Sequence, residues 1–195
     1  MENSNKYIII GILSIFLIMP MILGVYVQYI FVRTLDIFIF LFFLFGLVTL
    51  FIIGKLIHNY IFNKDSIELM RKHDVTNALI NRNNRIVIWL FFPLTMVMEE
   101  LIFRYYLIGF LIDSLKLDVL SVIFISSLIF SLYHIHTWFS YKNLTILITN
   151  LVYTFLMGLY IGFLFLNIGI VPCILIHYTL AFSLYYNIYK RYFKT

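Results

Sequence analysis

Six long runs of apolar residues occupy most of this 195-residue chain. Each run is continuously apolar rather than alternating, which favours membrane helices over membrane strands. Each run is also long enough to cross about 30 Å of hydrocarbon as a helix. The pattern therefore predicts an all-α, polytopic membrane bundle of about six transmembrane helices, at residues 7–32, 36–62, 86–112, 117–139, 144–167 and 170–189.

One polar stretch, residues 63–85, interrupts this pattern between the second and third runs. We expect a cytoplasmic loop there, and its scattered apolar residues are compatible with either a short interfacial helix or a solvated segment. The first run is too long for the core of a signal peptide and is expected to be a retained span. Residues 1–195 then form a single membrane-embedded domain, because six spans leave no room for a soluble one.

Composition agrees with a membrane protein, since 63% of the residues are hydrophobic and 12% are charged. The net charge is +5, but the basic residues lie at the ends of the apolar runs rather than on one basic face. This distribution indicates topology and argues against binding of nucleic acid. With six spans, nearly all loop lysines and arginines fall on one side, so the positive-inside rule predicts that both termini are cytoplasmic. The single cysteine, Cys173, excludes an intrachain disulfide.

Three charged residues, Glu99, Glu100 and Arg104, lie inside the third apolar run. A charge at the centre of a bilayer costs at least ~2.5–3.5 kcal/mol, so these side chains are expected to face partners, water or a substrate. Glu100 and Arg104 are four residues apart and share a helix face, which predicts an ion pair. Glu99 points about 100° away and has no partner on its own helix, so it is the candidate general base.

Two histidines from other runs, His134 and His177, are candidates to meet Glu99 in the bundle. Phe130 lies four residues before His134, where its ring can pack against the imidazole. One carboxylate and two imidazoles from three helices suit a hydrolytic site that holds a water molecule. The same set, Glu99, His134 and His177, is also a zinc ligand set, but the H-E-x-x-H spacing is absent and no metal ligands are assigned. From the residues alone, structural pairing and a proton or ion path stay open as alternatives.

Gly158 and Gly162 form a G-x-x-x-G pattern in the fifth run. Such a pattern predicts close approach of two helices, either within the bundle or between two copies of the chain. We expect packing within the bundle, where it would let the sixth helix carry His177 to the centre. The sequence does not predict the oligomeric state of the protein.

These motifs resemble those of the CAAX-prenyl-protease and bacteriocin-processing (CPBP) family, which includes intramembrane proteases like the Ras-converting endopeptidase. The stretch Glu99 to Arg104 resembles the family's E-E-x-x-x-R signature, and Phe130-x-x-x-His134 resembles its F-x-x-x-H motif. The segment around Gly158 and Gly162, followed by His177, is similar to the family's closing block. The resemblance covers residues 90–185, the motif-bearing core.

The resemblance implies a CAAX-protease-like core and a hydrolase that cleaves a peptide or membrane-associated protein with water activated by Glu99. His134 and His177 would complete the catalytic set, with Glu100, Arg104 and Phe130 in support, and a divalent metal such as zinc stays an open question. Bacterial relatives are linked to bacteriocin processing and immunity. The frequent Ile, Asn, Lys, Phe and Tyr are typical of AT-rich bacterial genomes, so we expect an integral protein of a bacterial cytoplasmic membrane.

At one position the chain differs from the family's pattern. The family's last motif has Asn or Asp four residues after the histidine, whereas this chain has Ala181. Loss of one oxyanion donor costs enzymes roughly 10²–10³ in turnover. The expectation is therefore a slow or impaired peptidase, and the alternative is a catalytically impaired immunity or scaffold protein with the same fold.

Overall fold

The computed structural model describes residues 2–31, 35–81 and 85–192, and the residues it describes form helices joined by short connections. In the part of the chain that the structure describes, each of the six apolar runs predicted from the sequence is largely helical, although the helix in the first run ends at Ile22. The first contains α1 (Glu2–Ile22). The second forms α2 (Ile37–Leu56), which continues as a π-helical turn over Ile57–Ile61.

The third run forms one helical path built from several pieces. A π-helical turn (Val87–Phe91) leads into α5 (Phe92–Glu100), and a second one (Leu101–Tyr106) leads into α6 (Leu107–Asp113). The remaining runs form α7 (Val119–Tyr133), α8 (His136–Tyr141), α9 (Leu144–Ile168) and α10 (Ile170–Tyr192).

Four of the helical segments are long and apolar enough to cross a membrane: Ile37–Ile61, Val119–Tyr141, Leu144–Ile168 and Ile170–Arg191. In the first run, Tyr7–Ile22 is a shorter apolar helix. The third run carries Glu99, Glu100 and Arg104 within one helical path, and these charges lower its hydropathy. The structure is thus the all-α, polytopic bundle expected from the hydrophobic pattern.

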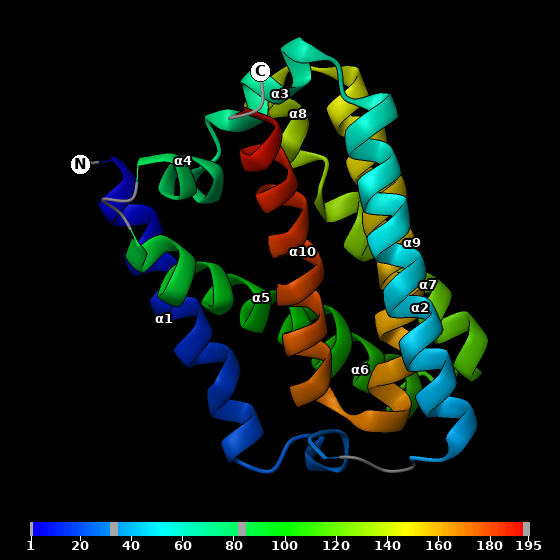
Figure 1. The fold of residues 1–195 in the computed structure, drawn as a ribbon. Helices are drawn as coiled ribbons and strands as arrows, with labels where there is room; N and C mark the ends of the chain where they lie inside the picture. The colour runs from blue at the N-terminus through cyan, green and yellow to red at the C-terminus, as the bar shows by residue number, and fades with distance from the viewer. Residues whose placement is uncertain (1, 32–34, 82–84, 193–195) are drawn as a thin grey trace.

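Residues 63–85 are largely helical in the part that the structure describes, with α3 at Lys64–Arg71 and α4 at Asp74–Asn81. Of the two forms expected for this stretch, the structure therefore has the helical one. α3 and α4 both contact α10. They place polar residues of this stretch beside the end of the bundle rather than away from it (Figure 1).

Helix starts follow the polar residues of the short connections. Asp36, Asn63, Asp118 and Asn143 each accept a hydrogen bond from a backbone N–H three residues ahead, at 2.8–3.1 Å. Such N-caps satisfy N–H groups that a helix start leaves without partners. The turn between α9 and α10 is the single residue Gly169, with φ +79° and a Cβ position only 2.7 Å from the Ile30 carbonyl oxygen. Only glycine fits this turn, because a side chain would be strained and would collide with backbone.

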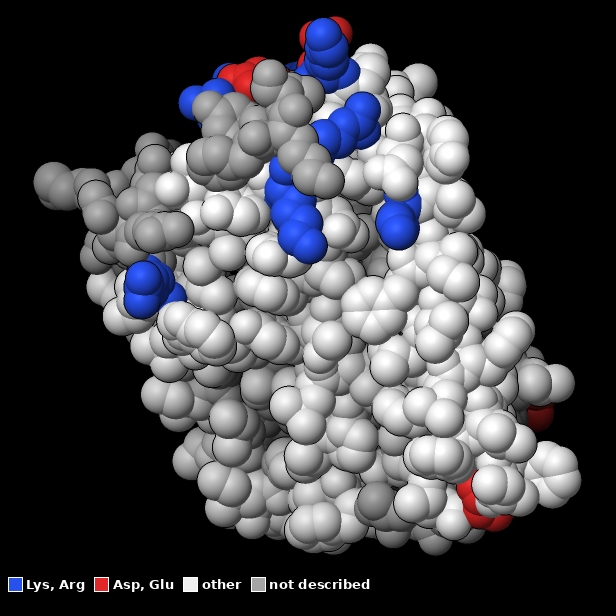
Figure 2. All heavy atoms as spheres, viewed as in Figure 1, with Lys and Arg blue, Asp and Glu red and all other residues white. Residues whose placement is uncertain are grey.

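α9 is the most buried of the candidate spans, and α7 packs along it. In Figure 1, α10 passes between α1 and α5 on one side and α2 and α9 on the other. α1 begins and α10 ends at the same end of the bundle. On the face in Figure 2, the Lys and Arg side chains gather toward that end and the broad middle is uncharged, as expected for a surface that faces lipid.

Candidate functional site

The two glutamates of the third run end α5 and are both buried, with side-chain exposures of 7% for Glu99 and 0% for Glu100. They share one partner from α10. The Nδ1 atom of His177 lies 2.8 Å from Oε1 of Glu100, and its Nε2 atom lies 3.8 Å from Oε2 of Glu99. The imidazole therefore sits between the two carboxylates and joins α5 to α10.

The predicted Glu100–Arg104 pair is present. Nε of Arg104 lies 3.5 Å from Oε2 of Glu100, and both side chains are fully buried. The guanidinium carbon lies 4.0 Å from the centroid of the Phe130 ring, at cation–π distance. Glu100 is thus held by a charge from its own helix and an imidazole from α10, while Glu99 is turned to the cavity beyond.

Phe130 connects the parts of the site that come from different helices. Its ring centroid lies 5.2–5.5 Å from the rings of Phe103 and His177, and 4.9 Å from the ring of His134. All three contacts are edge-to-face, the geometry that aromatic pairs favour. The sequence predicted the contact with His134, and the structure adds His177 and Arg104 to the same ring.

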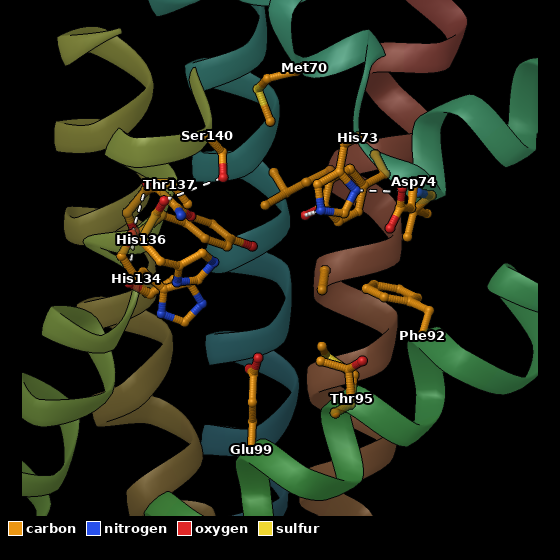
Figure 3. A pocket seen from close by; sticks show the side chains of 18 of the residues that line it. Met70, His73, Asp74, Phe92, Thr95, Glu99, His134, His136, Thr137 and Ser140 are labelled. Carbon is orange, nitrogen blue, oxygen red and sulfur yellow. Dashed lines mark hydrogen bonds between the residues drawn. The ribbon is translucent and has the colours of Figure 1, made fainter. Parts of the chain in front are cut away.

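His134 follows the last residue of α7, where the helical path breaks before α8. Its Nδ1 lies 2.9 Å from the Phe130 carbonyl oxygen, so Nδ1–H donates to that oxygen and Nε2 carries the lone pair. Figure 3 shows the His134 ring and the Glu99 carboxylate pointing into the same cavity. His134 can therefore accept a hydrogen bond from a water molecule or a substrate in that cavity.

The cavity has a volume of about 790 Å³ and reaches from the glutamates to the α3, α4 and α8 segments. All five histidines of the chain line it, as do Glu99 and Ala181. α10 contributes one face to its wall, at His177, Ala181, Leu184, Tyr185 and Ile188. Its volume lies in the range of small-molecule and peptide side-chain pockets.

The two glycines of the fifth run do bring helices close together, but the partner helix differs from the expected one. A Cβ added to Gly158 would lie 2.9 Å from Cβ of Ser127, and one added to Gly162 would lie 3.3 Å from the Ile123 side chain. Both neighbours belong to α7 rather than to α10. The glycine pair therefore brings in the helix of Phe130 and His134, because α9 packs lengthwise on α7.

Sequence reasoning missed the other cavity residues, among them Asp74 and the tyrosines of α1, α8, α9 and α10. They lie on separate segments, so no spacing rule connects them. The one available signal is on α10, where Tyr185 lies eight residues after His177 and hence on the same helix face.

Among the described residues, no group of three or more His, Cys, Asp or Glu side chains is placed to hold a metal ion. The Nδ1 atom of His177 is engaged by the Glu100 carboxylate, and the Nδ1 atom of His134 is engaged by the backbone carbonyl of Phe130. The expected set of Glu99, His134 and His177 does not converge as three metal ligands in the part of the chain that the structure describes.

The fold and the site define this chain as a polytopic helical membrane protein, in which buried carboxylates and histidines lie around a cavity. The family model of the type II CAAX prenyl endopeptidases, Rce1-like, matches residues 81–183. The chain belongs to this family of membrane proteases, as the resemblance of its motifs implied. No curated protein and no solved structure matches the chain.

Proposed function

We propose that this protein is an intramembrane endopeptidase in which Glu99 activates the attacking water molecule. The observation that carries the proposal is the position of Glu99: its carboxylate faces a large cavity, with His177 at 3.8 Å and His134 on the same cavity wall. A second buried carboxylate, Glu100, is already engaged by Arg104 and His177. The two glutamates thus have different surroundings and can perform different tasks.

In the proposed reaction, Glu99 takes a proton from water while the Nε2 lone pair of His134 orients that water. The water oxygen attacks the carbonyl carbon of the peptide bond. His177, carrying both ring protons, donates Nδ1–H to Glu100 and Nε2–H to the oxyanion, and the two carboxylates offset its charge. The C–N bond then breaks, and Glu99 returns the proton to the leaving amine. Glu100, Arg104 and Phe130 position His177 and do not touch the substrate.

The proposed setting is the bacterial cytoplasmic membrane, with both termini in the cytoplasm and a peptide or a membrane protein as substrate. The concentration of Lys and Arg at the end that carries both chain ends supports this orientation. The cavity extends toward that same end, so the substrate would enter from the cytoplasmic side. Bacteriocin or pheromone precursors are substrates of the expected kind.

The test is cleavage of internally quenched peptides by the purified full-length chain in lipid nanodiscs, with the cut bond located by mass spectrometry. Glu99→Ala should lower kcat by about 10²–10⁴, because the general base is lost. Glu68→Ala, at an exposed acid of α3, is the matched control and should keep full activity. Full activity in the Glu99→Ala chain would overturn the proposal.

Treatment with a zinc chelator separates the glutamate mechanism from a metal-dependent one. The proposed mechanism expects the cleavage rate to stay within about twofold after chelation and dialysis, because no step uses a metal. Loss of activity that added zinc restores would assign the chemistry to a metal instead.

A second candidate function is favoured by one observation. Ala181 lines the cavity one turn after His177, where the family pattern has a side-chain amide or carboxylate. A chain that lacks this donor would serve as a membrane immunity or scaffold protein if it bound its partner without cutting it. A partner-dependent phenotype that survives a Glu99→Gln, His134→Ala double substitution would favour this function over the peptidase.

A further inference from the structure

The face of α9 that lines the cavity carries a row of uncharged polar side chains: Thr149, Asn150, Tyr153 and Thr154. The Thr154 hydroxyl donates to the Asn150 backbone carbonyl at 2.8 Å, so it is engaged within its own helix. The side chains of Thr149, Asn150 and Tyr153 have no hydrogen-bond partner among the described residues. Thr149 and Tyr153 are buried, and Asn150 is half-buried. This wall of the cavity therefore offers hydrogen-bonding groups that the fold itself does not use.

The polar groups occupy only the middle of this helix face. Ile146, one turn before them, and Met157, one turn after them, also line the cavity and are apolar. Packing alone would be served by apolar residues throughout, because a buried polar group that has lost water and found no partner costs free energy. The row is therefore placed to form hydrogen bonds with a ligand in the cavity.

The register of α7 and α9 brings this row to the depth of the proposed water molecule. The two helices run antiparallel, and the Ser131 hydroxyl donates to the Leu151 carbonyl at 2.7 Å. From that level, His134 lies three residues past Ser131 and Asn150 lies one residue before Leu151, which is the same direction along the bundle. At 1.5 Å per residue, His134 and Asn150 differ in depth by about 3 Å.

An uncharged amide is the ligand that suits this wall. The carboxamide of Asn150 has N–H donors and a carbonyl acceptor, so it can form two hydrogen bonds with a peptide group, which has one of each. No lysine or arginine lines the cavity among the residues that the structure describes, so a carboxylate would be buried there without a counter-charge. The acids in the cavity wall, Asp74 and Glu99, belong to α4 and α5, so α9 offers no counter-charge to a cation either.

We propose that Asn150, with Thr149 beside it, binds a main-chain peptide group of the substrate close to the cut bond. This inference rests on the proposed peptidase function and adds a substrate class to it: an extended polypeptide that is recognised by its backbone. Such a site tolerates many side chains, and it disfavours a helical segment, whose peptide groups are already bonded to one another.

The depth of Asn150 also predicts which peptide group is bound. An extended chain covers about 3.3–3.6 Å per residue, which is about the difference in depth between Asn150 and His134. The bound peptide group is therefore expected within about two residues of the cut bond.

The experiment uses internally quenched peptides of one apolar parent sequence, in which single peptide bonds are replaced by esters. An ester lacks the N–H donor and has a weaker carbonyl acceptor, while the side chains stay the same. The cut bond itself is left as an amide, because an ester is intrinsically easier to hydrolyse. We expect kcat/KM to fall by about five- to tenfold for an ester at one position, within about two residues of the cut, and to change little elsewhere.

The readout is the ratio of the amide rate to the ester rate within each variant, because this ratio does not depend on how much protein is folded. Asn150→Leu, which keeps the size of the side chain, should lower the ratio to about one, and the smaller Asn150→Ala should do the same. Asn187→Leu is the matched control, at a half-buried asparagine of α10 outside the cavity, and should leave the ratio unchanged. Thr149→Val should reduce the ratio by about twofold, whereas Thr145→Val, outside the cavity on the same helix, should not. An unchanged ratio in the Asn150→Leu chain would overturn the inference.

Binding to the Glu99→Ala chain separates this inference from the peptidase proposal. Fluorescence anisotropy of the labelled peptides should give about five- to tenfold tighter binding for the amide than for the ester, and Asn150→Leu in the same background should equalise the two. If the wild-type chain cleaves nothing but this preference is present, the peptidase proposal fails and the main-chain site holds. If cleavage occurs and every ester peptide is bound and cut as well as the parent, the peptidase proposal holds and this inference fails.

Discussion

Single buried charges determine how this site is held together, and Glu100 is the clearest case. Its carboxylate is the shared partner of Arg104 and His177, and all three side chains are essentially excluded from the surface. Breaking a buried pair leaves a charge without compensation, which typically costs 3–5 kcal/mol. Glu100 is therefore expected to contribute to stability as well as to the placement of His177.

Glu100→Ala should lower the free energy of unfolding by about 3–5 kcal/mol, because Arg104 and His177 both lose their carboxylate. The measurement is denaturant or thermal unfolding of the purified protein in a mild detergent. Glu68→Ala provides the control, since its pair with Arg71 is exposed and such pairs contribute at most about 1 kcal/mol. Equal losses for the two substitutions would contradict the assigned role of Glu100.

At Ala181, in contrast, a substitution is expected to raise activity. An asparagine there would face the cavity one turn from His177 and could donate a second hydrogen bond to the oxyanion. Ala181→Asn is expected to raise kcat by at least about tenfold with little change in KM, since one oxyanion donor contributes roughly 10²–10³ to turnover in well-studied enzymes. Steady-state kinetics on the quenched peptides checks this. A lower kcat in a correctly folded variant would show that the position serves packing instead.

At the scale of helices, the contact between α7 and α9 places the His134 side of the site. Gly158 faces Ser127 so closely that even a methyl group would approach the Ser127 backbone to 3.0 Å. Backbone cannot give way as a flexible side chain can, so the two helices would have to move apart. Because α7 leads directly to His134, a shift of this contact reaches the cavity.

Gly158→Ala is expected to destabilise the protein by about 1–3 kcal/mol and to lower activity, because it overpacks this contact. Gly11→Ala is the matched control on α1, where an added Cβ meets nothing within 4 Å. There the substitution should stabilise the helix by about 0.5–1 kcal/mol, as alanine favours helix more than glycine does. Melting temperatures and peptide cleavage of both variants test the pair, and a destabilised Gly11→Ala chain would count against the reasoning.

Helix existence could be predicted from the sequence, whereas the contacts between helices could not. The apolar runs identify the spans because their period and length are local properties, and the Glu100–Arg104 pair follows from spacing on one helix. The contact of His177 with both glutamates depends on how α10 crosses α5, which no local pattern sets. The same holds for Asp74 and the tyrosines that line the cavity, which come from separate segments of the chain.

At the scale of the whole molecule, the distribution of charge and the position of the cavity bear on the proposed orientation in the membrane. The Lys and Arg side chains seen in Figure 2 gather at the end where α1 begins and α10 ends, and the cavity extends toward that end. By the positive-inside rule, this distribution supports the proposed orientation, with this end in the cytoplasm. Cys173 is fully buried, so cysteines added at the surface can report on this topology without interference.

A cysteine at Asp65, on α3, should react with a membrane-impermeant maleimide only after the cells are opened. A cysteine at Lys116, in the connection between α6 and α7, should react in intact cells, because that connection lies at the opposite end of the bundle. Gel-shift labelling before and after permeabilisation distinguishes the two. Labelling of the Asp65→Cys chain in intact cells would reverse the orientation and the proposed side of substrate entry.

The cavity wall includes Tyr7 near the start of the chain and Ile188 near its end. A ribosome that has released only the first five spans has therefore made a chain that lacks both His177 and one side of the cleft. In the proposed mechanism, such a nascent chain cannot cleave the proteins that are inserted beside it. Assembly of the cavity wall requires α10 to have entered the bundle.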